Sequence, residues 1–187
     1  MATVLVPLAQ GCEELEAITI VDLLRRAGIE VITAGLEEGP VRASRGTVLL
    51  PDTTLDAVAD RDFDMVVLPG GLPGADHLDQ DPRIRELLRR HLASGHYVGA
   101  ICAAPKVLAH AGLLDGRHAT SYPGVLEGLE VPGLQLESAP VVQDGKVVTS
   151  RGPGTAMDFA LKLIELLAGR DKREEVESTL QRPSCCT

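Results

Sequence analysis

The hydrophobic pattern alternates between two kinds of segment along almost the whole chain. Short apolar runs bounded by glycine or proline are typical of buried strands, and they predict extended segments at residues 3–9, 29–34, 47–50, 64–68 and 97–101. Apolar positions three and four residues apart predict helices at residues 13–27, 82–93, 103–111, 155–167 and 171–180. The stretch 118–148 is rich in β-formers and turns, and Asp144-Gly145 within it predicts a hairpin.

This alternation of strand and helix predicts one α/β domain over residues 1–187, with a mostly parallel sheet that helices cover on both faces. The terminal segment 181–187 is expected to be a flexible tail. Ligands of such sheets bind beyond the carboxyl ends of the strands. Four loops are therefore candidates for a functional site, those that follow Ala9, Leu68, Ile101 and Ser150.

The charge balance excludes several classes of partner. With 18 Lys+Arg against 27 Asp+Glu, the formal net charge is −9, which argues against a nucleic-acid or anionic-membrane surface. Aromatic residues make up 2% of the chain, too few to stack bases or to sandwich a flavin. No stretch approaches the ~20 apolar residues of a membrane span, and the first residues do not resemble a signal peptide.

Cysteine usage indicates a reducing compartment. The four cysteines form no CxxC pair, which disfavours a zinc ribbon or a thioredoxin-type site. Free thiols in the cytoplasm are the natural interpretation. We expect no metal and no cofactor, because the sequence also lacks phosphate-loop and dinucleotide-binding motifs. Cys185 and Cys186 fall in the terminal tail and do not form a prenylation box.

Cys102 is the sharpest candidate for chemistry. It stands where a buried apolar run passes straight into a predicted helix, with small residues on both sides. This pattern is typical of a nucleophile elbow, with cysteine in place of serine. A thiol at a helix N-terminus faces unpaired N–H groups, which predicts a lowered pKa. The alternative is a buried structural cysteine.

Two further features could serve the same thiol. The glycine-rich turn at residues 69–74 contains Gly70 and Gly71, and the N–H groups of Gly71 and Ala103 are candidate oxyanion donors; the alternative is a tight surface turn. Glu16 lies one turn inside the first helix, where its carboxyl could reach Cys102 and transfer a proton. The acids before it, Glu13 and Glu14, are explained by the helix dipole.

The histidines argue against two enzyme classes. A cysteine hydrolase needs a histidine base beside its thiol, yet none of the five histidines directly follows Cys102 and none forms a His-x-Glu pair. Protease and glutamine amidotransferase activities are therefore disfavoured. Arg45 and Arg151 stand beside strand ends, where each could bind a carboxylate, brace a subunit contact or form a surface salt bridge.

Four segments together resemble the ThiJ/PfpI superfamily, in particular the subgroup of the parkinsonism-associated protein deglycase and its bacterial relatives. They are GCEELE (11–16), VLPGG (67–71), AICAAP (100–105) and TSRGPGT (149–155). The resemblance implies a flavodoxin-like fold and a homodimer. It also implies an oxidation-sensitive Cys102, hydrogen-bonded by Glu16, and a pocket bordered by residues 44–46 and 151–153, with Pro153 contributed by the partner subunit.

One departure concerns the position of a histidine that the human-type sequence carries before proline. Here that position is Tyr122, and a tyrosine hydroxyl is a poor base at neutral pH, which favours the bacterial branch. The resemblance implies glutathione-independent glyoxalase or deglycase chemistry on dicarbonyls or glycated groups through a Cys102 hemithioacetal. The alternatives are a non-enzymatic sensor or redox-regulated chaperone that is oxidised to sulfinic acid at Cys102, and a structural subunit with an inert cysteine.

Overall fold

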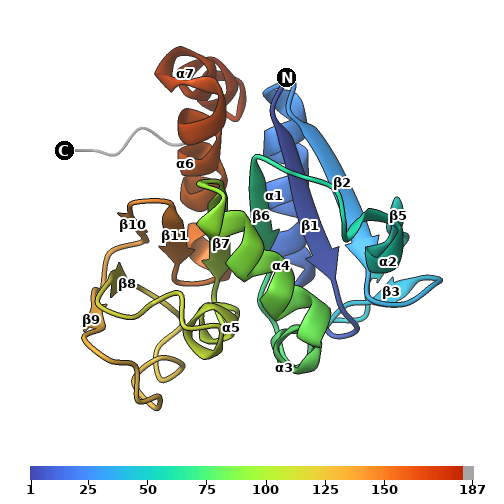
Figure 1. The fold of residues 1–187 in the computed structure, drawn as a ribbon. Helices are drawn as coiled ribbons and strands as arrows, with labels where there is room; N and C mark the ends of the chain where they lie inside the picture. Colours follow the sequence, from blue (N-terminus) through green and yellow to red (C-terminus); the bar gives the residue numbers. More distant parts are fainter. Residues whose placement is uncertain (183–187) are drawn as a thin grey trace.

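A seven-stranded sheet forms the centre of the molecule (Figure 1). Its order from edge to edge is β10 (Val141–Asp144), β11 (Val147–Ser150), β7 (Tyr97–Ile101), β6 (Met65–Leu68), β1 (Thr3–Leu8), β2 (Glu30–Gly35) and β5 (Thr53–Thr54). Every neighbouring pair is parallel except β10 and β11, which form an antiparallel hairpin. The hairpin expected from Asp144-Gly145 is present, and its turn is formed by Gly145 and Lys146, with Asp144 as the last residue of β10. The computed structural model describes residues 1–182, so most of the expected flexible tail, with Cys185 and Cys186, lies outside the described residues.

Helices cover both faces of this sheet. One face carries α1 (Glu14–Arg26) and α6 (Ala156–Ala168), and α7 (Arg170–Thr179) packs against α6; the other carries α2 (Leu55–Val58), α3 (Gly74–Gln80), α4 (Pro82–Ala93) and α5 (Pro105–His110). Alternate residues of β1 point to opposite faces, with Val4 and Val6 in the core under α1 and Leu5 in the core under α4. The predicted flavodoxin-like α/β fold is confirmed.

Two of the helices begin where the sequence supplies a side-chain cap. Glu13 caps α1 by accepting the N–H of Glu16, and Asp81 caps α4 ahead of Pro82. The short α3 is absent from the sequence prediction, because its seven residues follow a glycine-rich turn and show too few apolar repeats. The helix expected from residue 103 begins two residues later, at Pro105, whose fixed φ and missing N–H suit a first helical position.

A small hairpin outside the main sheet joins β3 (Val41–Arg42) to β4 (Val48–Leu49), and Glu14 holds its turn. The Glu14 carboxylate accepts the N–H of Arg45 at 3.0 Å, the N–H of Thr47 at 3.3 Å and the Ser44 hydroxyl at 3.2 Å. Burial acts to raise the pKa of Glu14, but N–H donors of Glu14, Arg45 and Thr47 outweigh it and lower the pKa to about 2. Glu14 therefore fixes the 43–47 turn beside the start of α1, beyond the dipole role expected from the sequence.

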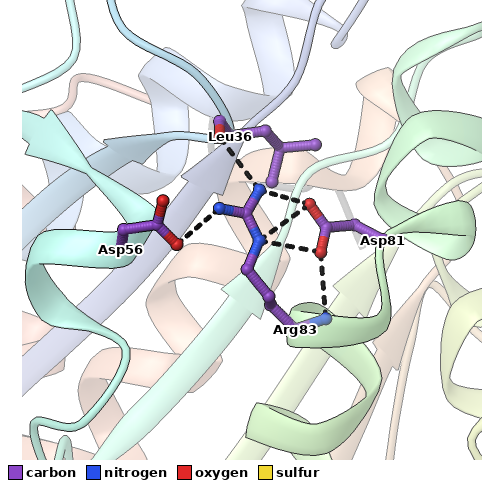
Figure 2. A network of polar contacts seen from close by, with 4 residues as sticks. All are labelled: Leu36, Asp56, Asp81 and Arg83. Carbon is purple, nitrogen blue, oxygen red and sulfur yellow. Dashed lines mark hydrogen bonds and ion pairs between the residues drawn. The ribbon is translucent and has the colours of Figure 1, made fainter.

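A polar network ties the ends of β2, α2 and α4 together (Figure 2). The Arg83 guanidinium donates to both oxygens of Asp81, to Asp56 Oδ1 at 2.6 Å and to the Leu36 carbonyl at 2.9 Å. Asp81 is mostly buried and Asp56 is exposed. The network links the residue after β2 to the first turns of α2 and α4.

Two smaller elements lie near the carboxyl edge of the sheet. A parallel pair joins β8 (His118–Ala119) to β9 (Gln135–Leu136), and a 3-10 turn, η1 (Pro153–Thr155), leads into α6. Across residues 1–182, each helix is too short or too polar to cross a membrane.

Candidate active site

Cys102 occupies a strained turn directly after β7. Its φ is 63°, in the left-handed region that residues other than glycine rarely adopt. Its N–H donates to the Ser150 carbonyl at 3.0 Å and its carbonyl accepts the Tyr122 N–H at 2.9 Å. Neighbouring segments therefore hold the strained backbone on both sides. Two turn residues, Ala103 and Ala104, separate Cys102 from α5, so the expected direct passage from strand to helix is wrong in detail.

Glycines allow the loop after β6 to approach this turn closely. A Cβ at Gly70 would lie 2.7 Å from the Cβ of Cys102 and 2.9 Å from the Ala103 nitrogen. Gly71 has a φ of 86°, and a Cβ there would lie 2.4 Å from the Glu13 nitrogen. Only glycine fits at both positions. The consequence is that the Gly71 and Ala103 N–H groups both interact with the Cys102 thiol.

Glu16 lies on α1 and points its carboxyl into the same place. Its side chain is fully buried, and Oε2 accepts the Gly70 N–H at 2.8 Å. Oε1 is buried and makes no hydrogen bond of normal geometry with the described residues. The carboxyl also interacts with the Cys102 thiol. The structure thus brings together five residues from three separate segments of the sequence: Glu16, Gly70, Gly71, Cys102 and Ala103.

Burial shifts both pKa values upward, and a neighbouring glutamate adds to each shift. Burial raises the pKa of Glu16 to about 7, with Glu13 adding to the effect, while the Gly70 N–H and the Cys102 thiol oppose it. Burial, followed by the charge of Glu16, raises the pKa of Cys102 to about 12, against the Gly71 and Ala103 N–H groups. The lowered thiol pKa predicted from the sequence is therefore wrong, because these two donors cannot outweigh desolvation and a neighbouring carboxylate.

Glu16 and Cys102 titrate as one coupled pair. Between pH about 7 and about 12 the pair has lost one of its two protons and carries one negative charge. The Gly70 N–H stabilises that charge on the carboxylate, and the Gly71 and Ala103 N–H groups stabilise it on the sulfur. A proton that moves from Cys102 to Glu16 therefore creates a thiolate that already has two donors in place. This is the arrangement of a nucleophile activated by an adjacent base.

The remaining predicted residues lie around this centre or outside it. Tyr122 is 52% exposed, and its backbone is tied to Cys102. Arg151 donates through its guanidinium to the Ser138 carbonyl at 3.0 Å. The Arg45 backbone is held by Glu14 and its side chain is exposed. Pro153 begins η1. Within the described part of the chain, none of these four side chains forms a hydrogen bond or an ion pair with Cys102.

Gly152, which belongs to the 151–153 segment expected at the border of the pocket, lies near both the candidate nucleophile and the exposed Tyr122. A Cβ at Gly152 would lie 4.0 Å from Cys102 Sγ and 3.3 Å from the Tyr122 ring. The sequence analysis singles out Arg151 and Pro153 in this segment for their side chains. The structure adds that Gly152, which has no side chain, leaves space beside the thiol. Four small residues therefore lie near the Cys102 thiol: Gly70, Gly71, Ala103 and Gly152.

A separate cleft lies elsewhere on the molecule. It measures about 640 Å³, lies beyond the ends of β1 and β2, and is lined by residues that include Gln10, Leu36, His77 and Arg83. Its lining contains neither Glu16 nor Cys102. The volume of this cleft therefore does not identify the candidate active site, which is identified by the polar contacts of Glu16 and Cys102. Among residues 1–182, no cluster of three His, Cys, Asp or Glu side chains could hold a metal ion.

Comparison with known proteins gives the chain its family. It is 48% identical to Protein dj-1beta of Drosophila melanogaster over 177 residues, which cover 94% of this chain and 95% of that protein. It is 38% identical to the glutathione-independent glyoxalase DJR-1.2 of Caenorhabditis elegans, over 98% of this chain and 95% of that one. The crystal structure of Drosophila melanogaster DJ-1beta superposes with a TM-score of 0.93 at 46% identity, covering 98% and 99% of the two chains.

The curated relatives are mainly eukaryotic, so the expected bacterial-type subgroup is not confirmed. Residues 2–166 match the DJ-1/PfpI family itself. This chain belongs to the DJ-1/PfpI family.

Proposed function

We propose that the protein is a cysteine-dependent enzyme that converts 2-oxoaldehydes into 2-hydroxy acids without glutathione. The observation that carries the proposal is the buried Glu16–Cys102 pair, with the Gly71 and Ala103 N–H groups on the sulfur. A relative of 38% identity is named a glutathione-independent glyoxalase. That name concerns the relative, and it supports the same reaction class here.

The reaction begins with addition of the Cys102 thiol to the aldehyde. The S–C bond forms, the carbonyl π bond breaks, and the thiol proton passes through Glu16 to the new oxygen, giving a hemithioacetal. The Gly71 and Ala103 N–H groups are placed to stabilise negative charge at sulfur and at the adjacent oxygen.

Glu16 then moves a proton between the two substrate carbons. Its carboxylate removes the hydrogen of the hemithioacetal carbon and returns it to the neighbouring carbon. The first carbon is thereby oxidised to a thioester and the second reduced to an alcohol. Water cleaves the thioester, releasing lactate from methylglyoxal or glycolate from glyoxal and restoring the thiol. A carboxyl with a pKa of about 7 can act as base and as acid at neutral pH. Removal of early glycation adducts would start from the same thiol addition.

The direct test is methylglyoxal consumption with lactate detection in glutathione-free buffer. Cys102→Ser is expected to abolish turnover, and a variant that keeps more than a few per cent of the rate would refute the mechanism. Cys12→Ser is the matched control. Cys12 is also buried and free, and burial raises its pKa to about 11, but it has no part in the proposed reaction.

The unpartnered Oε1 of Glu16 favours a second role, as a peroxide sensor. Peroxide oxidises the Cys102 thiolate to sulfenic and then sulfinic acid. A protonated Glu16 would donate to a sulfinate oxygen and stabilise that state. Intact-mass and peptide analysis after graded peroxide tests this role. Two added oxygens on Cys102 before any on Cys12 support it, and equal oxidation of the two counts against it.

We also propose that the protein works as a homodimer in the cytoplasm. Leu15 and Ile18 are about half exposed on one face of α1, and Val48 and Leu50 are exposed on the β4 segment that Glu14 joins to α1. An apolar face of this kind is typical of a subunit contact. Sedimentation of the wild type and of Ile18→Lys tests the dimer, because a lysine in the contact should give monomers.

A further inference from the structure

Tyr122 places a large aromatic side chain near the Cys102 sulfur, across the main chain of Gly152. A Cβ atom added to Gly152 would lie 4.0 Å from Cys102 Sγ, 3.3 Å from Tyr122 Cδ2 and 3.9 Å from Tyr122 Cε2. The Tyr122 N–H is bonded to the Cys102 carbonyl at 2.9 Å, which fixes the tyrosine backbone relative to the turn. Because Gly152 has no side chain, nothing at that point separates the ring edge from the thiol.

Apart from Glu16, which handles the proton, the other groups near the sulfur are too small to bind a substrate substituent. Gly70, Gly71 and Ala103 contribute backbone N–H groups to the pair, and Gly152 contributes only its main chain. These groups recognise the charge that forms at sulfur and oxygen, which every 2-oxoaldehyde shares. They provide no contact that would distinguish a methyl substituent from a larger one.

Tyr122 is instead 52% exposed, although large apolar surfaces are usually buried. Its hydroxyl makes no hydrogen bond with residues 1–182, so no polar contact explains the position of the ring. An exposed aromatic face beside a reactive thiol can pack against a flat apolar group. The ring therefore suits a substituent carried by the substrate rather than proton transfer.

We propose that Tyr122 is a specificity-determining residue that makes aryl 2-oxoaldehydes, of the phenylglyoxal class, preferred substrates over methylglyoxal. The inference rests on the proposed function. Cys102 adds to the aldehyde as before, and the aryl group on the neighbouring carbon packs against the tyrosine ring. The product is the 2-hydroxy acid, and no oxidant or reductant is consumed because the redox change is internal.

The measurement is the ratio of kcat/KM for phenylglyoxal to that for methylglyoxal in the wild type, Tyr122→Phe and Tyr122→Ala. Tyr122→Phe keeps the ring and should keep the ratio. Tyr122→Ala should lower the ratio about three- to tenfold, the range expected for one aromatic pair. An unchanged ratio in Tyr122→Ala, or a ratio lost in Tyr122→Phe, would overturn the proposal.

A second readout separates this inference from the proposed function. Cys102 is alkylated with N-phenylmaleimide and with N-methylmaleimide, and its adducts are quantified by peptide mass spectrometry relative to free cysteine. The aryl-to-methyl rate ratio should fall in Tyr122→Ala and hold in Tyr122→Phe even if no variant turns over a 2-oxoaldehyde. Such a result would refute the proposed enzymatic activity and support the contact between Tyr122 and an aryl group bound at Cys102. An unchanged maleimide ratio would refute that contact, whether or not the protein turns over 2-oxoaldehydes.

Discussion

Replacing Glu16 with glutamine should change how the reactivity of Cys102 depends on pH. In the wild type, the pair loses its first proton near the Glu16 pKa of about 7. Below that pH both groups are protonated and no thiolate is present. As the pH rises through about 7, the thiolate form of the pair appears, and its population then stays constant until the second proton leaves near 12.

The magnitudes make this profile easy to recognise. Raising the thiol pKa from 9.0 to about 12 lowers the thiolate fraction roughly a thousandfold, equivalent to about 4 kcal/mol. A thiol that simply titrated at that value would be about one part in 10⁵ thiolate at pH 7. Proton sharing with Glu16 removes part of this penalty, because a protonated carboxyl no longer repels the sulfur. Glu16→Gln abolishes the sharing and also the negative charge, leaving burial opposed by the Gly71 and Ala103 N–H groups.

The assay is the second-order rate of Cys102 alkylation by iodoacetamide between pH 5 and 10, with the adduct located by peptide mass spectrometry. The wild type should rise to a plateau with a midpoint near 7. Glu16→Gln should show no midpoint there and should rise about tenfold per pH unit through neutrality. Turnover of 2-oxoaldehydes should fall about 10²- to 10⁴-fold, the usual contribution of a general base. Identical alkylation profiles in the two proteins would refute the shared-proton interpretation.

Three further substitutions, the first with a matched control, test other parts of the structure. Arg83→Met should destabilise the fold by about 1–3 kcal/mol, because Asp81 and the Leu36 carbonyl lose their donors, whereas Arg26→Met, which breaks an exposed pair, should leave the Tm unchanged. Burial lowers the pKa of His91, so the stability that the neutral side chain gives to the fold is present above pH 6.5 and is lost as the pH falls below 6.5. His91→Gln should flatten that part of a curve of Tm against pH. Gly152→Ala should slow Cys102 alkylation at unchanged Tm, since its extended φ of 165° tolerates alanine while the new methyl narrows the approach to the sulfur.

The sheet and the larger helices are predictable because their signal is local. Each of the central strands is a short apolar run that ends in turn residues, and each long helix shows its own apolar repeat, so neighbours far along the chain are not needed to identify them. For the same reason, the sequence pattern does not predict the short elements. The helix Gly74–Gln80 and the strand Thr53–Thr54 carry too few residues to show a period, and only their packing against the rest of the molecule identifies them.

The composition of the site was also predictable, but its electrostatics were not. Ligands of parallel sheets bind at one edge, which is enough to expect the loops containing Gly71 and Cys102 to meet near the start of the first helix. The sign of the thiol pKa shift depends on how completely Glu16 and Cys102 are desolvated together, and burial is a property of the whole packed structure. The role of Glu14 escaped similarly, because its three donors lie about thirty residues away in the chain.

The raised pKa values of Glu16 and Cys102 are compatible with a reactive cysteine, because Glu16 accepts and holds the proton that the Cys102 thiol loses. A lone thiol with a lowered pKa would be permanently charged and open to any oxidant. In this pair the thiolate exists only while Glu16 holds the proton, and the proton is then in place to be delivered to the substrate oxygen. Backbone donors fixed by Gly70 and Gly71 stabilise either position of the charge, so the transfer needs little rearrangement. The strained turn at Cys102 is what brings the sulfur within reach of both the carboxyl and the donors.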